Sequence, residues 1–220
     1  EPLPLSQDEL SITGHAIEAR IYSENPQKNF LPSTGTLRRL RAPAESNKLR
    51  IDTGVREGDE VSMFYDPMIA KLITWDRDRA TALRRLCNAL ERYEIAGVIT
   101  NVNFLAAVAG HQAFASGNLE TSFIEKHKKV LIPAPGPVPD QALALAGLGL
   151  LLSRQGFQAP ADPYSPWNRV DAWRLNDQGY DELYFIDQDG SEIEVTVHYP
   201  EDGGYRLQLP GGEMLADGEI

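Results

Sequence analysis

A run of prolines divides this chain. The segment LIPAPGPVPD, residues 131–140, contains four prolines and one glycine in ten residues. Proline lacks a backbone N–H and fixes φ, so neither a helix interior nor a central strand can pass through the segment. We therefore predict two domains, residues 1–130 and 140–220, joined by a proline-rich linker at 131–139.

Charge is distributed unevenly between these two parts. Residues 1–130 carry 17 Lys and Arg with 17 Asp and Glu, whereas residues 131–220 carry 4 against 15. The net charge of −11 therefore comes from the second part. An acidic surface repels phosphate groups, which argues against nucleic acid or an anionic membrane as a partner. The acidity favours either solubility alone or a basic protein partner.

The composition indicates a globular protein, because 42% of the residues are hydrophobic and 220 residues suffice for a sizeable core. The single cysteine, Cys87, cannot form an internal disulfide and is expected to be a small packed hydrophobe. The chain begins Glu-Pro-Leu-Pro without a methionine or a signal-like apolar stretch. We therefore expect it to be a piece of a longer polypeptide.

The first part is predicted to be α+β. Polar and apolar residues alternate in GHAIEARIY, residues 14–22, as they do in a strand. Further strands are expected at 35–43, 49–55 and 60–75, and a meander is the simplest arrangement of them. Asp76 or Asp78 can cap a helix that runs to about Tyr93. Two shorter helices are expected at 101–110 and 121–131.

One charge interrupts the apolar stretch FYDPMIAKLITW, residues 64–75. Lys71 stands in the middle of the run, and Asp66 precedes it. A lysine can lay its alkyl stem on apolar surface while the ammonium reaches a carboxylate or water. We predict a core strand with a structural charge here, and the alternative is the bottom of an active site.

The second part begins with a helix that is apolar on every side. We expect Asp140 to cap it and Gly156 to end it, and the residues from Ala142 to Leu152 carry no polar side chain. This run is too short to span a bilayer, so protein must cover the helix all around. Strands predicted at 171–176, 181–187, 191–199 and 204–210 would form a β-barrel-like sheet wrapped around it.

Catalytic motifs are scarce in the sequence. The four histidines are scattered, and no His or Cys stands at ligand spacing, so no metal site is expected. GLGLLL lies inside a predicted helix and lacks the preceding strand of a nucleotide-binding fingerprint. These patterns alone indicate a two-domain protein of unknown function.

Several ordered blocks carry a family resemblance: GHAIEARIYSENP, NFLPSTGTL, LRIDTGVREGDEVSMFYDPMIAKLITWDRDRATAL and GVITNVNFL. Together they make residues 12–130 resemble the C-terminal domain of biotin carboxylase in biotin-dependent acyl-CoA carboxylases. The blocks GNLETSFIEKH and SPWNRVDAWRLN look like those of bacterial 3-methylcrotonyl-CoA carboxylase alpha subunits. Geranyl-CoA and propionyl-CoA carboxylases share most of the earlier blocks and remain the alternative.

The resemblance implies a ligase that carboxylates biotin with bicarbonate and Mg-ATP, acts in leucine degradation and resides in the bacterial cytoplasm. The ATP-grasp domains would precede residue 1 and the biotin attachment site would follow residue 220. We therefore expect this chain alone to be inactive and to bind neither biotin nor Mg-ATP. Residues 140–220 would begin the bridging (BT) domain. Its implied partners are the carboxyltransferase (beta) subunit and the biotin carboxyl carrier domain.

The resemblance also assigns roles to single residues. Arg50 aligns with the catalytic arginine that faces the ureido oxygen of biotin and stabilises the enolate. Thr121 aligns near the edge of the ATP pocket. Without the resemblance, Arg50 would be interpreted as a strand residue paired with Asp52 or Glu57. The competing hypothesis for the whole chain is a non-catalytic module that only docks subunits.

Overall fold

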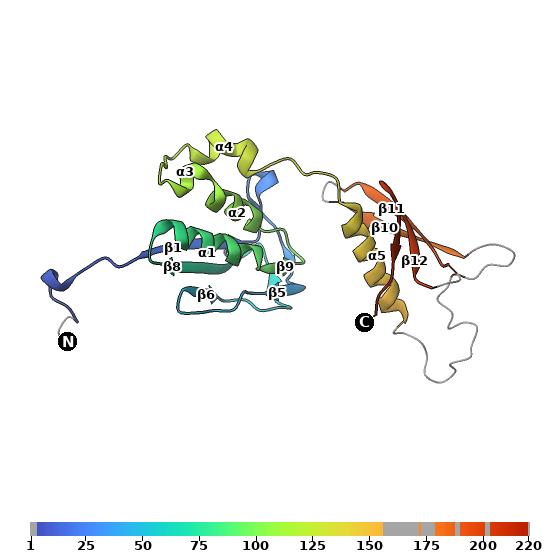
Figure 1. Ribbon diagram of the computed structural model, residues 1–220, viewed down its shortest axis with the longest axis horizontal. Helices are drawn as coiled ribbons and strands as arrows, with labels where there is room; N and C mark the ends of the chain where they lie inside the picture. Colours follow the sequence, from blue (N-terminus) through green and yellow to red (C-terminus); the bar gives the residue numbers. More distant parts are fainter. Residues whose placement is uncertain (1–3, 156–171, 173–178, 188–189, 201–202, 220) are drawn as a thin grey trace. The chain divides into compact units, whose positions relative to one another are not determined.

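The computed structural model describes residues 4–155, 172, 179–187, 190–200 and 203–219. The chain divides into two compact units, Glu1–Ala134 and Pro135–Ile220 (Figure 1). Each unit has a hydrophobic core of its own.

A three-stranded antiparallel sheet is the centre of the first unit. It consists of β1 (His15–Tyr22), β8 (Met68–Asp76) and β6 (Leu49–Thr53), in the order β1-β8-β6. The predicted meander is therefore wrong, because β8 lies between two strands that both precede it in the sequence. The most apolar of the three strands occupies the centre, where neighbours on both sides pair its backbone.

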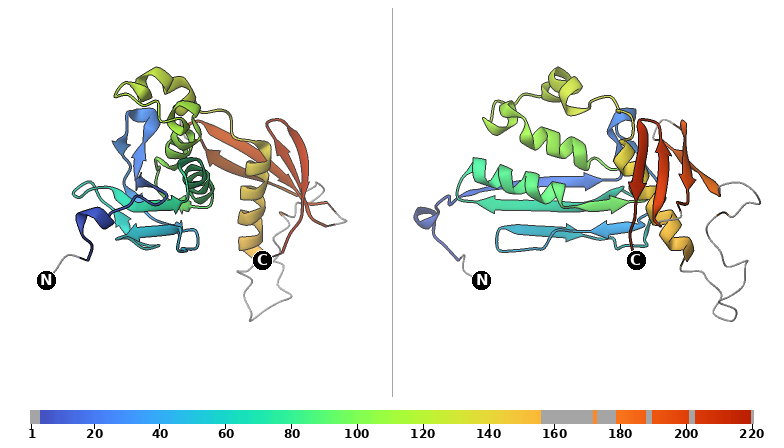
Figure 2. Two further views of the ribbon diagram at one scale, coloured as in Figure 1. Left: turned by 60° about the vertical axis from the view of Figure 1, so that its left-hand side comes forward. Right: turned by 45° about the vertical axis from the view of Figure 1, so that its right-hand side comes forward.

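Helix α1 (Arg79–Glu91) lies along one face of this sheet (Figures 1 and 2). Alternate residues of each strand point toward the helix, and their apolar side chains meet its leucines. The core contains the following buried residues from the two long strands and α1: Ile17, Ala19, Ile21, Ala70, Leu72, Leu83, Leu86 and Leu90. The residues between them along each strand face away from α1.

Of the two candidate aspartates, Asp78 caps α1. The Asp78 side chain accepts a hydrogen bond from the Thr81 backbone N–H at 2.8 Å, and this bond lowers the pKa of Asp78. Asp76 ends β8 instead and is buried. The helix ends at Glu91, close to the predicted end.

The described part of the first unit also contains three pairs of short strands: β2 (Glu24–Asn25) with β3 (Leu31–Pro32), β4 (Gly35–Thr36) with β7 (Glu60–Val61), and β5 (Arg39–Arg41) with β9 (Glu94–Ala96). The single strand predicted at 35–43 is therefore two strands that pair with different partners. Gly97 follows β9 at φ +104°, and a Cβ there would lie 2.0 Å from the Thr36 carbonyl oxygen. Only glycine fits at this crossing.

The remaining helices of the first unit are α2 (Val102–Gly110), α3 (Gln112–Ala115) and α4 (Phe123–Leu131), with short 3-10 helices at Gln7–Glu9 and Pro26–Lys28. Asn101, directly before α2, is buried. Its side chain accepts from the Tyr22 N–H at 2.9 Å and donates to the Arg20 carbonyl at 3.2 Å. These two bonds attach the start of α2 to the end of β1.

The second unit consists of one helix on one sheet. Helix α5 (Asp140–Gln155) packs on a four-stranded antiparallel sheet of β10 (Tyr180–Ile186), β11 (Glu192–His198), β12 (Tyr205–Leu209) and β13 (Gly212–Ala216). Leu143 and Leu151 of α5 are buried against Val195, Val197 and Leu207. The sequence analysis missed β13, and the strand predicted at 171–176 lies, apart from Ala172, outside the described residues.

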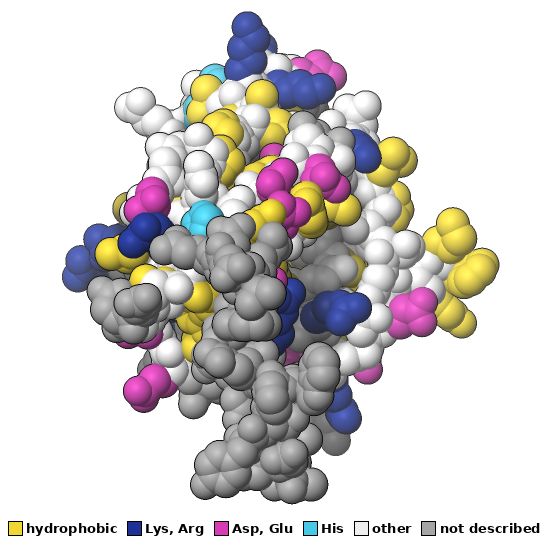
Figure 3. Space-filling model, turned by 90° about the vertical axis from the view of Figure 1, so that its right-hand side faces the viewer, with side chains coloured by type: hydrophobic (Ala, Val, Ile, Leu, Met, Phe, Trp, Pro, Cys, Tyr) yellow, Lys and Arg dark blue, Asp and Glu magenta, His cyan; other side chains and the backbone are white. Residues whose placement is uncertain are grey.

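The predicted barrel around α5 is not confirmed. Among the described residues the four strands form an open sheet that covers one side of the helix. Leu145 is 70% exposed and Leu150 is 46% exposed. Figure 3 shows one face of the molecule, on which hydrophobic side chains lie among acidic and basic ones. A Cβ on Gly147 would lie 3.4 Å from Leu183, whereas nothing lies within 4 Å of one on Gly149. Of the two glycines, only Gly147 is therefore explained by close packing.

Candidate functional site

The outward face of the first sheet carries the residue that the resemblance singled out. Strand alternation turns Arg50 and Asp52 of β6 away from α1, because Leu49 and Ile51 pack toward it. The register places Arg50 opposite Ile73 and Asp52 opposite Lys71. On the other side of β8, Glu18 faces Ile73 and Arg20 faces Lys71. Charged residues of both signs therefore cover this face.

Arg50 forms a two-point ion pair with Asp52. Its Nε donates to Oδ1 at 2.8 Å and its Nη2 donates to Oδ2 at 3.1 Å. The Arg50 side chain is 72% exposed. The hydrogen bond to Asp52 raises the pKa of Arg50, so the guanidinium stays charged. Among the described residues Nη1 has no hydrogen-bond partner, and one edge of the guanidinium is open to an incoming acceptor.

Asp52 is shared with a second cation. The Lys71 ammonium lies 3.9 Å from Oδ2 of Asp52. The hydrogen bond from Arg50, followed by the charges of Arg50 and Lys71, lowers the pKa of Asp52. Lys71 thus lies on the outward face of a core strand with its ammonium near a carboxylate, as the structural interpretation predicted. Asp66 accepts a hydrogen bond from the Met68 N–H at 3.0 Å, at the point where β8 begins.

Glu57, the other proposed partner of Arg50, is engaged elsewhere. It lies 3.6 Å from the Arg41 Nε and accepts a hydrogen bond from the Leu40 N–H at 2.9 Å. Asp52 is therefore the partner of Arg50.

Thr121 lies in another part of the first unit. It is exposed in the turn that precedes α4. Within the described part of the chain, no hydrogen bond or ion pair connects Thr121 with Arg50. The structure thus gives Arg50 a defined polar environment and gives Thr121 an open surface.

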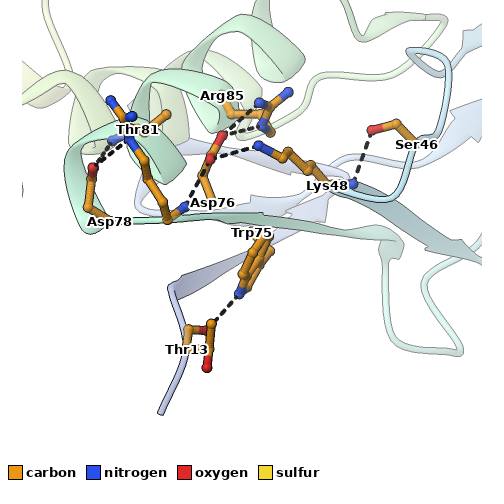
Figure 4. A network of polar contacts seen from close by, with 9 residues as sticks. Thr13, Ser46, Lys48, Trp75, Asp76, Asp78, Thr81 and Arg85 are labelled. Carbon is orange, nitrogen blue, oxygen red and sulfur yellow. Dashed lines mark hydrogen bonds and ion pairs between the residues drawn. The ribbon is translucent and has the colours of Figure 1, made fainter.

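The sequence analysis missed a charge cluster at the end of β8 (Figure 4). The carboxylate of Asp76, 4% exposed, accepts hydrogen bonds from the Arg85 Nη2 at 2.7 Å, the Lys48 Nζ at 2.9 Å and the Arg77 N–H at 2.9 Å. The bonds from Arg85, Lys48 and Arg77, in that order, hold the pKa of Asp76 far below its ordinary value. Beside it, the Trp75 indole donates to the Thr13 carbonyl at 3.2 Å. One signal in the sequence could have revealed the cluster. If the predicted strand 60–75 is extended by one residue, the alternation that places Leu72 and Thr74 on the buried face places Asp76 there too. A carboxylate on the buried face requires cations nearby.

Metal chelation has no candidate in the described part of the chain. No group of three or more His, Cys, Asp or Glu side chains there could hold a metal ion. No described helix has the length and hydrophobicity needed to cross a membrane.

The chain is similar along nearly its whole length to mitochondrial methylcrotonoyl-CoA carboxylase alpha subunits. It is 45% identical to that of Dictyostelium discoideum over 224 residues, which covers 98% of this chain and 32% of the relative. It is 55% identical to that of Glycine max over 228 residues, which covers 94% of this chain and 31% of the relative. The chain thus spans about a third of the length of these relatives.

Solved structures match as well. The biotin carboxylase domain of Hydrogenobacter thermophilus 2-oxoglutarate carboxylase, in complex with MgADP, ADP and bicarbonate, is 36% identical with a TM-score of 0.58. The match covers 61% of this chain and 30% of that one.

These comparisons correct the expected location. The sequence analysis placed the protein in the bacterial cytoplasm, but the methylcrotonoyl-CoA carboxylase subunits of Dictyostelium discoideum and Glycine max are mitochondrial proteins of eukaryotes. That expectation was wrong because this chain is 45% and 55% identical to those mitochondrial proteins, so the family resemblance does not indicate a bacterial protein.

The family model for the biotin carboxylase C-terminal domain matches residues 18–126. This range contains the whole β1-β8-β6 sheet except the first residues of β1, together with α1 and Arg50. The chain therefore belongs to the biotin carboxylase family, and residues 18–126 are its C-terminal domain.

Proposed function

We propose that this chain is part of the biotin carboxylase subunit of a methylcrotonoyl-CoA carboxylase, which uses ATP and bicarbonate to carboxylate biotin in leucine degradation. Two observations support the proposal: the similarity to methylcrotonoyl-CoA carboxylase alpha subunits and the position of Arg50 on an open sheet face. The exposed position of Arg50 supports the chemical part of the proposal.

Arg50 supplies a charge-assisted donor to an oxygen that becomes negative during the reaction. When the ureido oxygen of biotin gains charge as its nitrogen is deprotonated, a guanidinium nearby stabilises that oxygen without moving. Asp52 holds the Nε edge of the guanidinium, which orients the fork and leaves Nη1 for the substrate. Arginine suits this role because it remains charged next to a developing anion.

The cofactors of this function are biotin and Mg-ATP. Of the described residues, Arg50 fits an oxyanion of biotin by its charge and open edge. Thr121, exposed in the turn before α4, is proposed to contact the edge of the ATP pocket. No cluster of described residues fits Mg²⁺, so we assign the metal ligands to none of the described residues.

The second unit is proposed to be a BT-type bridging domain that docks the carboxyltransferase (beta) subunit. Leu145 on α5 and Leu215 on β13 are 70% and 74% exposed and line one surface cavity of about 370 Å³ within this unit. Large exposed aliphatic side chains in one place are typical of protein contact sites. The biotin carboxyl carrier domain is the further proposed partner of the carboxylase.

The function is tested in a carboxylase subunit that contains this chain. Incubation with Mg-ATP, bicarbonate and free biotin is expected to give biotin-dependent ADP release. Adding the carboxyltransferase subunit with methylcrotonoyl-CoA, geranyl-CoA or propionyl-CoA in separate assays is expected to give the fastest carboxylation with methylcrotonoyl-CoA. Preference for another acyl-CoA would correct the substrate, and absence of biotin-dependent ADP release would leave a docking module.

A further inference from the structure

A cavity of about 280 Å³ lies on the α1 side of the first sheet, where the chain leading into β6 passes the helix. Ser46 and Leu49 form one wall. Arg84, Arg85 and Asn88 of α1 and Arg92, directly after the helix, take part in the other. Strand alternation separates the cavity from Arg50, because Leu49 points toward α1 and Arg50 points away from it. The cavity is thus no part of the site described above.

The charge of this cavity is strongly positive. Within the described residues, Arg84 and Arg92 form no ion pair and no side-chain hydrogen bond. Arg85 shares the single carboxylate of Asp76 with Lys48, so that cluster also retains an excess positive charge. Three guanidinium groups therefore line one space, and within the described residues only that of Arg85 has an acidic partner.

Apart from Asp76, the carboxylates next to the cavity residues in the sequence have other partners. None of the described residues that line the cavity is an Asp or a Glu. Glu45, the neighbour of Ser46, accepts a hydrogen bond from the Ile51 N–H at 2.9 Å, and its charge helps to raise the pKa of Arg50. Glu91 is the neighbour of Arg92. After burial, the charge of Glu91 is the second cause that raises the pKa of the Cys87 thiol, and Cys87 does not line the cavity.

We propose that this cavity binds a small anion that bears phosphate groups. Guanidinium groups match phosphate oxygens in pairs. Arg84 and Arg92, which have no acidic partner among the described residues, line the concave space together with Arg85, so its positive charge favours a phosphate group. The side chains of Asn88 and Ser46 add neutral donors at the wall. The proposal is independent of the carboxylase function, because it rests on residues of the opposite side of the sheet.

The test titrates inorganic phosphate and pyrophosphate into the 220-residue chain at constant ionic strength, with chloride as the balancing anion. Arginine Nε–H resonances report binding at single residues. Saturable shifts are expected for Arg84, Arg85 and Arg92. Arg84→Gln and Arg92→Gln are each expected to weaken binding about tenfold, the effect of one lost charge-assisted hydrogen bond.

Arg56→Gln is the matched control, since it removes one exposed arginine charge from a loop outside the cavity. It is expected to leave the affinity unchanged. Circular dichroism of each variant checks that it remains folded. Arg84→Lys, which retains the charge, is expected to recover part of the affinity. Equal weakening by Arg56→Gln, or shifts that grow linearly with phosphate without saturating at these arginines, would overturn the proposal.

Discussion

Arg50 and Asp52 lie two residues apart on the outward face of β6, and the guanidinium of one donates to both carboxylate oxygens of the other at 2.8 and 3.1 Å. The same pair can be an ordinary surface ion pair or the support of a catalytic donor. In the second case Asp52 fixes the direction in which the free edge of Arg50 points, and the loss of Asp52 affects turnover more than stability.

Asp52→Asn in the carboxylase subunit is therefore expected to lower the kcat for biotin carboxylation, with a smaller effect than the loss of Arg50 itself. An amide accepts one hydrogen bond from the fork and carries no charge, so the guanidinium is less well oriented. Steady-state kinetics with free biotin measure the effect. Glu18→Gln is the control, because it removes a carboxylate from the same sheet face. Equal kcat values for the two variants would assign Asp52 no positioning role.

Asp76 is expected to control stability as a function of pH. Its pKa in the folded state is far below the unfolded value of about 3.9. A lowered pKa stabilises the fold above the unfolded pKa, and this contribution disappears as the pH falls through the folded pKa. Asp76→Asn is therefore expected to lower the free energy of unfolding most at pH 7, and the difference from wild type should shrink below about pH 4. Urea denaturation at several pH values measures it.

Glu60→Gln provides the comparison for Asp76→Asn, because Glu60 is exposed and has no ion pair in the described part of the chain. Its effect is expected to be small at every pH. A difference between Asp76→Asn and wild type that persists unchanged at low pH would mean that the carboxylate charge is not what stabilises this cluster.

Shortening a leucine side chain of α5 is expected to reduce the stability of the second unit only on the buried side of the helix. Leu151 is 3% exposed in the core of the second unit, whereas Leu145 on the same helix is 70% exposed. Leu151→Ala should reduce stability by about 2–5 kcal/mol, and Leu145→Ala by no more than about 0.5 kcal/mol. Hydrogen exchange of the backbone amides in β11 and β12 measures the stability of the second unit separately from that of the first. Similar losses for both variants would indicate that protein covers α5 all around, as the barrel hypothesis states.

Gly97→Ala is expected to destabilise the first unit. The positive φ alone costs about 1–3 kcal/mol for a residue with a Cβ, and the contact with the Thr36 carbonyl adds to it because backbone cannot move aside. At Gly54, which has no neighbour within 4 Å of a Cβ, the same replacement should change little. Thermal unfolding of the two variants compares them, and equal melting temperatures would contradict the close crossing of β9 and β4.

Local patterns in the sequence predicted the elements better than their pairing. The leucine spacing and the two candidate caps predicted α1 to within about two residues at each end, since both signals are local. The order β1-β8-β6 was missed because the residues of β8 pair with residues 17 to 61 positions away in the sequence, and periodicity says nothing about which strands meet. The same limit applies to the strand predicted at 35–43, which divides between two partners.

The candidate site was predictable in part. The resemblance identified Arg50, and the pairing with Asp52 follows from two strand residues that share a face. The partners of Asp76 were not predictable, because Lys48, Asp76 and Arg85 come from a loop, a strand end and a helix that meet only in the folded chain. The uniform apolar character of α5 indicated burial on every side, yet the described strands cover one side.

We propose that Arg50 stabilises the anionic oxygen of biotin, and the kcat of Arg50→Ala for carboxylation of free biotin tests this role most directly. In a carboxylase subunit that contains this chain, the loss of one donor to a developing oxyanion should lower kcat by about 10² to 10³, with little change in KM or melting temperature. Arg50→Lys should recover only part of the rate, because one ammonium cannot replace the planar fork. A folded Arg50→Ala variant with near-normal kcat would contradict the account and leave Arg50 as the ion-pair partner of Asp52.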